Sequence, residues 1–427
     1  MNYKKTFVLG LGFFVISLTW PLYNTFVPIF LNKYITSATL IGFIMTLDNI
    51  AAITLQPYFG AKSDSTRTKY GRRMPYLLIG IPLSAVFFSM IPFHLVIEEI
   101  SDLSYTIFNW EVTLGFIFLI FIVTCFNLSM SIYRAPTVAL MPDITPLKER
   151  SKANGIINFM GGFGAVFALF AGGKMFAVKA GLPFTVSAIL MLFVIFVLYK
   201  TVKEPEKLKT DEKEEKQSIS KALVGLFKRE NRSALLILLA IFFWFVGYQG
   251  IEATFSLYGV NFLGLAEHQP ALLLAGFSAA FLLMAIPSGL IGTKIGKRNT
   301  ILIGIIGLMS VFLILNYVET ILLLRIFLIV GGIFWAFVNI NSYPMVVELT
   351  TEEKIGTYTG LYYFFSSLAA ITGPVIFGLI IDIVGYKHLF FTAFSAFFLA
   401  FLCIYLVKNP SLGSTSDIGS TDEVATI

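Results

Sequence analysis

Three charged side chains stand inside long apolar stretches of the sequence: Asp48, Arg134 and Glu252. A charge held at the centre of a bilayer costs at least ~2.5 kcal/mol, so it usually faces a polar cavity. Asp48 lies ten residues into its apolar stretch, and at the helical rise this is roughly 15 Å from the end. That depth is near the middle of a ~30 Å hydrocarbon core, where we expect chemistry rather than packing.

The three side chains suit different tasks. Burial disfavours the ionised form of a carboxyl, so Asp48 and Glu252 are candidate proton-coupling residues. The planar fork of Arg134 can donate two hydrogen bonds to vicinal hydroxyls or to a carboxylate. Structural alternatives stay open: a polar contact of Asp48 with Asn24, an ion pair of Arg134 with either carboxyl, and a solvated Glu252 at a cavity mouth.

Polar and aromatic residues on the same apolar helices are weaker substrate-binding candidates. Amides bond hydroxyls in both directions, although each such residue more often holds helices together. These candidates are Trp20, Asn24, Asn127, Gln249, Asn339, Asn341 and Tyr363. No spacing indicates a metal site, a nucleophile or a phosphate loop, so we expect no cofactor, no metal and no enzyme activity.

The composition indicates that lipid is the main solvent of this chain. Of its 427 residues, 57% are hydrophobic and only 13% are charged, against about 25% charged in soluble domains. A cytosolic enzyme or a nucleic-acid binder is therefore excluded. The net charge of +6 fits basic loops beside an anionic leaflet. We expect a monomer in the bilayer, with no nucleic-acid partner.

Apolar runs between polar turns predict an all-α membrane protein with twelve spans. We place them at 7–31, 38–61, 74–95, 112–141, 153–178, 181–200, 233–262, 270–292, 299–318, 321–348, 355–382 and 387–407. The charged segment 201–232 reads as a linker between an amino-terminal bundle, 1–200, and a carboxy-terminal bundle, 233–408. The polar tail 409–427 is predicted to be disordered.

The distribution of cations orients the chain. With the amino terminus inside, all but six of the 31 Lys and Arg lie on the inner side. The exceptions are Lys33, Lys174, Lys179 and Lys387 outside, and Arg134 and Arg325 within spans. The excess of cations on cytoplasmic loops predicts a multi-pass protein with both termini in the cytoplasm. We expect the membrane to be a bacterial cell membrane.

The two halves contain two copies of one sequence motif. Gly60-x3-Asp64 followed by Gly71-Arg72-Arg73 closes the second span, and Gly289-x3-Thr293-x2-Gly296-Lys297-Arg298 closes the eighth. Asp143-x-Thr145 is echoed in the same way by Glu348-x-Thr350. Such repeats are typical of two pseudo-symmetric six-helix bundles with a site between them.

These motifs and the six-plus-six layout resemble the major facilitator superfamily. Gln56-Pro57-x2-Gly60, Gly71-Arg72-Arg73-x-Pro75 and Tyr133-Arg134-Ala135 are similar to sucrose:proton symporters and bacterial glycoside:cation symporters. The resemblance implies proton-coupled symport of a sucrose- or maltose-like glycoside or oligosaccharide by alternating access, with Arg134 binding substrate.

Two departures bear on the coupling ion. The sucrose symporters carry an aspartate where this chain has Val123, so their proton site does not transfer by position. Symporters of the melibiose type place an acid before the proline that ends the second span, where this chain has Gln56. A sodium site of carboxylates is thereby weakened, and a proton is the better expectation.

The charged groups at the cytoplasmic ends are predicted to form a gating latch. They are Asp64, Arg72, Arg73, Asp143, Arg150, Arg298 and Glu348. The alternative is that the basic turn only sets topology. Because the superfamily turn does not specify substrate, an exporter or a carrier of another small solute is the alternative function. A sensor built on a transporter fold ranks behind both.

Overall fold

The computed structural model describes residues 3–101, 103–107, 110–146, 149–204, 231–318, 320–348 and 355–407. Within this part, eleven helices are long and apolar enough to cross a membrane, and a pair bent by 42° supplies a twelfth span. The predicted all-α membrane fold is therefore confirmed. The linker 205–230 and the tail 409–427 lie outside the described residues.

The first half contains α1 (Tyr3–Asn32), α2 (Ala38–Ser65), α3 (Met74–Met90), α4 (Phe93–Ile100), α5 (Leu114–Ile144), α6 (Arg150–Val178) and α7 (Leu182–Thr201). The second half contains α9 (Arg232–Leu257), the π-helical turn η3 (Tyr258–Phe262), α10 (Gln269–Ile295), α11 (Lys297–Leu315), α12 (Ile321–Val347), α13 (Ile355–Val384), the 3-10 turn η5 (Tyr386–His388) and α14 (Leu389–Leu406).

Two local features differ from the sequence prediction. The third span breaks into α3 and α4 at Pro92, whose missing N–H and fixed φ oppose a straight helix. A short antiparallel hairpin, β1 (Ser104–Ile107) and β2 (Trp110–Thr113), follows α4. It adds a minor β element that an all-α prediction did not foresee.

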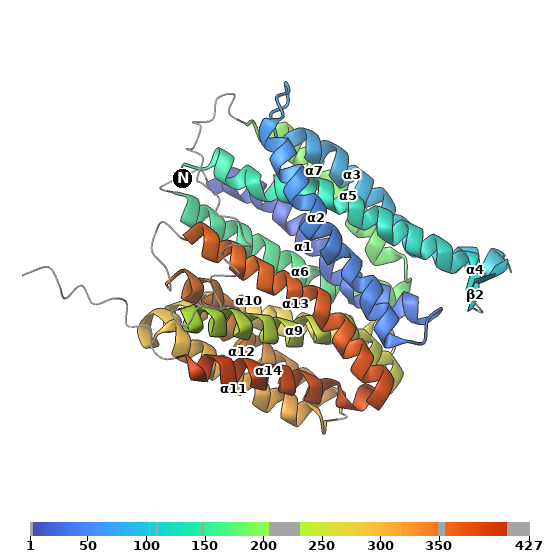
Figure 1. The fold of residues 1–427 in the computed structure, drawn as a ribbon. Coiled ribbons are helices and arrows are strands. Elements are labelled where there is room, and N and C mark those ends of the chain that lie inside the picture. The colour runs from blue at the N-terminus through green and yellow to red at the C-terminus, as the bar shows by residue number, and fades with distance from the viewer. Residues whose placement is uncertain are drawn as a thin grey trace, which may run out of the picture.

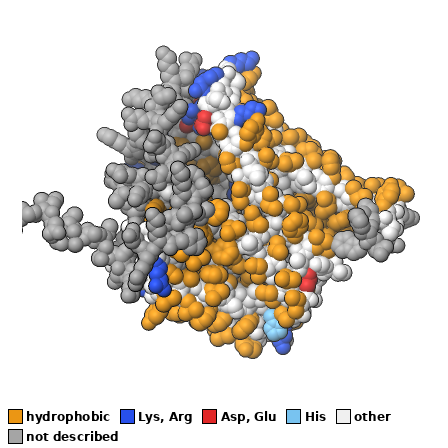
Figure 2. Space-filling model, in the orientation of Figure 1, with side chains coloured by type: hydrophobic (Ala, Val, Ile, Leu, Met, Phe, Trp, Pro, Cys, Tyr) orange, Lys and Arg blue, Asp and Glu red, His pale blue; other side chains and the backbone are white. Residues whose placement is uncertain are grey.

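Each half has an apolar core of its own. Phe26, Phe88 and Phe126 are fully buried in the first half, and Trp244 and Phe390 are fully buried in the second. The helices of each half lie together as one group in Figure 1. On the outside, Figure 2 shows hydrophobic side chains across the visible face and charged groups at its edges. This arrangement suits a lipid solvent.

The halves meet along α2 with α13, α6 with α10, and α1 with α9. We call the end with Arg72, Arg73, Lys297 and Arg298 the basic end, and the opposite end, with Asp382, the distal end. Of these pairs, α2 and α13 lie close together near the distal end and draw apart toward the basic end (Figure 1).

Glycine permits the close approach of α2 and α13 near the distal end. A Cβ at Gly42 would collide with the backbone oxygen of Pro374, and one at Gly378 would collide with the backbone oxygen of Ala38. These helices therefore touch backbone to backbone, as small residues allow in membrane proteins.

Candidate functional site

A cavity of about 270 Å³ lies between the two halves. The predicted residues Trp20 and Asn24 of α1, Arg134 of α5 and Glu252 of α9 all line it. Trp20 and Glu252 are more than 200 residues apart in the sequence, and the fold brings them together. The cavity therefore has one cationic group and one acidic group on an otherwise largely apolar wall.

Arg134 faces this cavity with its donors free. Its guanidinium carbon lies 5.0 Å from the ring centroid of Trp20, a cation–π contact. No hydrogen bond or ion pair within 4.0 Å engages the guanidinium among the described residues. The ion pair with Asp48 or Glu252, which was the structural alternative to substrate binding, is accordingly not formed in this conformation.

Glu252 joins the two halves at the level of the cavity. The side-chain nitrogen of Asn24 donates to Glu252 Oε1 over 3.2 Å. The contact expected between Asn24 and Asp48 is therefore replaced by one between Asn24 and Glu252. Glu252 is a partly exposed residue of α9 that lines the cavity on the side of α1.

Asp48 is buried beside the cavity, with 5% of its surface exposed. Its Oδ1 accepts from the backbone N and from Nδ2 of Asn49, at 2.5 and 2.9 Å. Its Oδ2 is buried and has no hydrogen-bond partner among the described residues. The predicted pair of carboxyls thus consists of one enclosed group and one cavity-lining group.

The remaining predicted substrate residues divide into two sets. Gln249 lines a small chamber beside the cavity. Asn127 donates to the hydroxyl of Tyr23 over 3.1 Å, and Asn341 donates to Ser288 Oγ over 3.1 Å, which ties α12 to α10. Both make the helix contacts that were the structural alternative.

Asn339 and Tyr363 also lie away from the cavity lining. Tyr363 is 61% exposed on α13. The sequence did not single out the cavity residues Tyr248 and Trp335, whose rings stack at 4.4 Å with planes 3° apart. No signal marks them, because aromatic residues are frequent along all these helices.

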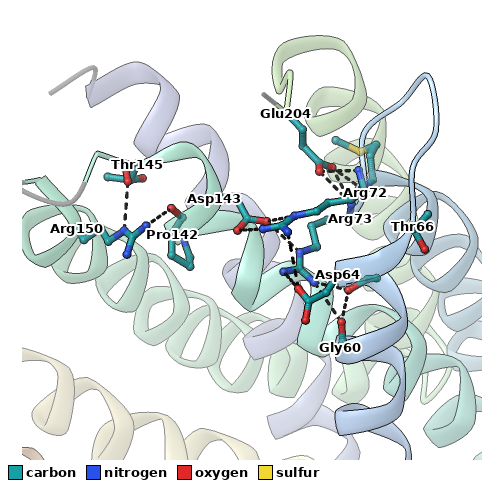
Figure 3. A network of polar contacts seen from close by, with 12 residues as sticks. Gly60, Asp64, Thr66, Arg72, Arg73, Pro142, Asp143, Thr145, Arg150 and Glu204 are labelled. Carbon is teal, nitrogen blue, oxygen red and sulfur yellow. Dashed lines mark hydrogen bonds and ion pairs between the residues drawn. The ribbon is translucent and has the colours of Figure 1, made fainter. Parts of the chain in front are cut away.

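The basic turn forms a dense network with α5 at the basic end (Figure 3). Arg72 binds Asp143 through two nitrogens, at 3.0 and 2.5 Å, and Arg73 Nε binds Asp143 at 3.0 Å. Arg73 also bonds to Asp64 and to Ser63 Oγ. The side chain of Asp143 is only 10% exposed, so two cations neutralise one nearly buried carboxylate.

Glu204 completes this network and was not predicted. Its carboxylate accepts from the backbone N–H groups of Arg72, Arg73 and Met74, at 2.8, 3.0 and 2.7 Å. These N–H groups lie at the start of α3, where a helix attracts an anion. Pro75 could have located this helix start, because proline is favoured in the first turn of a helix. The partner was missed because Glu204 lies in the segment 201–232, which was predicted to be a solvated linker.

The second half repeats the arrangement in weaker form. Gly71 and Gly296 both have positive φ, 107° and 85°, a conformation that glycine adopts without strain. Lys297 pairs with Glu348 as Arg72 pairs with Asp143. The predicted pseudo-symmetry of the halves thus extends to the acid that each basic turn binds.

Two other predicted gating residues bond to backbone carbonyls. Arg150 donates to the oxygens of Pro142 and Thr145, and Arg298 donates to those of Ile404 and Tyr405. All the gating contacts described above lie within a single half. In this conformation they brace each half separately.

Polar contacts between the halves gather at the distal end. Asp382 of α13 accepts from Ser37 Oγ at 2.6 Å, Ala38 N at 2.7 Å, and Thr39 N and Oγ1 at 3.0 and 2.6 Å. Lys33 lies 3.4 Å from Glu267 across the same boundary. We call the Asp382 contact to residues 37–39 the distal clasp. The conformation is therefore closed at the distal end.

Comparisons with known proteins agree with this architecture. A profile described as Major Facilitator Superfamily matches residues 9–271 and 260–421. An isoprimeverose transporter of Lactiplantibacillus pentosus is 23% identical over 319 residues, 71% of this chain and 62% of that relative. A class H tetracycline resistance protein of Pasteurella multocida is 22% identical over 371 residues, 83% of each chain.

Solved structures are similar in fold. A nucleoside transporter, NupG, aligns with a TM-score of 0.73 at 14% identity, covering 94% of this chain and all of that one. A bacterial homologue of the lysosomal transporter Spinster, inward-facing and occupied, aligns with a TM-score of 0.70 at 13% identity, covering 95% and 97%. With a family match over nearly its whole length and two six-helix halves around a central cavity, the chain belongs to the Major Facilitator Superfamily of membrane transporters.

Proposed function

We propose that this transporter moves a glycoside or oligosaccharide of the sucrose or maltose type together with a proton. The observation that supports it most is Arg134, whose unbonded guanidinium stacks on Trp20 at the wall of the central cavity. A planar fork beside an aromatic face is suited to a sugar ring, because the fork binds vicinal hydroxyls and the ring covers the C–H face. Asn24 and Glu252 add polar groups across the cavity.

Transport would proceed by alternating access. The distal clasp closes one end, and α2 and α13 draw apart toward the other. Rocking of the halves about the midplane site would reverse this state. The basic end would face the cytoplasm, following the excess of cations on cytoplasmic loops. Both termini would then be cytoplasmic in a cell-membrane protein acting as a monomer.

The proton would be carried by the carboxyls near the cavity, Asp48 and Glu252. Both lie within helices, and among the described residues that line the cavity and the chamber, Arg134 is the cation that could balance them. Two carboxylates and one guanidinium leave an uncompensated negative charge, which is costly in a membrane interior. A bound proton removes that cost, and its release on one side would link proton flow to solute flow.

The test is uptake into proteoliposomes of the full chain with a panel of radiolabelled disaccharides. We expect accumulation when a pH gradient, acidic at the distal side, is imposed, and none with a sodium gradient alone. Uptake that follows sodium and ignores the pH gradient would reject proton coupling. No uptake or exchange of any sugar in the panel would reject the substrate class.

Export of an apolar solute is the second candidate function. One side of the cavity is formed by Leu274, Phe277, Phe312 and Phe397, and a relative is a tetracycline resistance protein. An apolar wall of this kind suits a flat aromatic compound. Proton-driven accumulation of tetracycline in inverted vesicles, without sugar uptake in upright ones, would favour this function.

A further inference from the structure

A second, smaller chamber adjoins the central cavity. Its volume is about 20 Å³, enough for one water molecule or one small ion. Its polar lining consists of Asn24, Asn49, Gln249 and Glu252, and the rest is apolar: Trp20, Met45, Ala253, Ala370 and Pro374. Trp20, Asn24 and Glu252 line the large cavity as well, so the two spaces share one wall.

The hydrogen bonds of the described residues that line this chamber use the amide donors of its two asparagines. The amide nitrogen of Asn24 is engaged by Glu252 Oε1, and that of Asn49 is engaged by Asp48 Oδ1. The amide oxygens of both residues therefore remain to bind a ligand, together with the second oxygen of Glu252. A small space lined by amide and carboxylate oxygens suits a cation or a water molecule that donates.

The charged groups around the chamber do not balance one another. Among the titratable groups near it, Asp48 lies on α2, Arg134 on α5 and Tyr248 one turn earlier on α9. From α1 and α13 the chamber wall receives only uncharged residues. Arg134 is the one cation among these groups, so one of the two carboxyls is left without a counter-charge.

Access from the central cavity favours Glu252 over Asp48 as the ion-binding carboxyl. Glu252 lines both the chamber and the cavity, whereas Asp48 lines neither and is 5% exposed. A coupling ion must reach its site from the cavity and leave through it.

We propose that the chamber is the coupling-cation site, with Glu252 as its charged ligand, and that Asp48, which lies outside both spaces, does not take up the coupling ion. The cation is a proton on Glu252, which converts the carboxylate to the acid and bonds to one chamber water. This inference rests on the proposed function, and it deepens it by dividing the roles of the two carboxyls.

Because the Asn24–Glu252 bond spans the halves, cation binding also acts on the contact that alternating access must break. Solute in the large cavity meets the same two residues. The shared wall is thus a direct physical route for coupling between the two sites.

The test uses infrared titration of the full-length protein in liposomes, without any sugar. We expect a protonated-carboxyl band that titrates in the wild type and in Asp48→Asn, and that is lost in Glu252→Gln. Glu267→Gln, which removes a distal carboxyl outside the chamber, is the matched control and should leave the band unchanged. A band lost in Asp48→Asn and kept in Glu252→Gln would overturn the proposal.

A second arm identifies the cation by replacing KCl with NaCl at constant ionic strength. If sodium is the occupant instead, NaCl erases the Glu252 band and raises the thermal midpoint of the wild type but not of Glu252→Gln, which would overturn the proton assignment. Asn49→Leu keeps all charges and removes one chamber amide, so it should weaken cation affinity by about tenfold. If neither protons nor sodium distinguish the wild type from Glu252→Gln, the site is refuted, whatever solute the protein carries.

Discussion

Replacing Asp382 with asparagine is expected to open the distal end of the protein. The carboxylate accepts four hydrogen bonds from residues 37–39, at 2.6 to 3.0 Å, and it sits at the N-terminus of α2, where negative charge is favoured. Hydrogen bonds to a charged group contribute about 1.5–3 kcal/mol each when buried. Those of Asp382 are partly exposed, and asparagine keeps one acceptor.

The net loss for the closed state is therefore about 1–3 kcal/mol, which corresponds to a roughly 5- to 150-fold shift in a two-state equilibrium. Serine and threonine at positions 37 and 39 supply two of the donors. Ser37→Ala with Thr39→Val should consequently produce a smaller shift in the same direction, because the backbone donors remain.

The assay is a spin-label distance distribution across the distal end. Labels at Val178 and Tyr317 would suit it, because these exposed residues lie at the distal end of α6 and in the turn after α11, one in each half. The native Cys125 and Cys403 would first be replaced by serine. We expect Asp382→Asn to populate longer distances.

Glu98→Gln is the matched control. Glu98 is another distal carboxylate, but it accepts from Thr113 within the first half. Its variant should keep the wild-type distribution. An unchanged distribution in Asp382→Asn would refute the view that the clasp holds the distal end closed.

Three further predictions follow from particular contacts. Arg134→Lys should raise the KM for the transported solute by at least tenfold, because lysine lacks the planar fork; an unchanged KM would remove Arg134 from the binding site. Asp143→Asn should destabilise the protein by about 3 kcal/mol, since two cations lose a nearly buried partner, whereas Arg150→Gln, which loses only bonds to carbonyls, should cost about 1 kcal/mol; thermal unfolding that ranks them equally would contradict this. Gly42→Val should hold the distal end open, because its side chain would meet the Pro374 carbonyl; the same spin labels would report it, and a closed distribution would show that α2 can shift to accommodate the side chain.

The spans and the repeat were predictable because they rest on averages over many residues. About twenty apolar residues in succession have few alternatives to a membrane helix. The echo between Asp143 and Glu348 likewise located the acid that each basic turn binds. Single charged residues were informative for a different reason: an ionised group within an apolar helix needs polar surroundings.

Helix rotation limited what could be predicted of the site. Asn24 and Asn341 are both amides on apolar helices, yet one lines the cavity and the other bonds to Ser288 in a helix contact. Helices that are apolar all round carry no periodic signal to tell which side faces inward. Packing between helices decides the rotation, so the sequence could not tell that in this conformation Tyr248 lines the cavity and Tyr363 does not.

The two basic turns imply an uneven tolerance of mutation along a duplicated chain. Asp143 is 10% exposed and holds two guanidiniums, whereas Glu348 is 57% exposed and pairs with one lysine. Screening every substitution at both positions should therefore find few functional replacements at 143 and many at 348. Descent from one ancestral repeat would then have left one copy as the constrained half and the other as the half free to diverge.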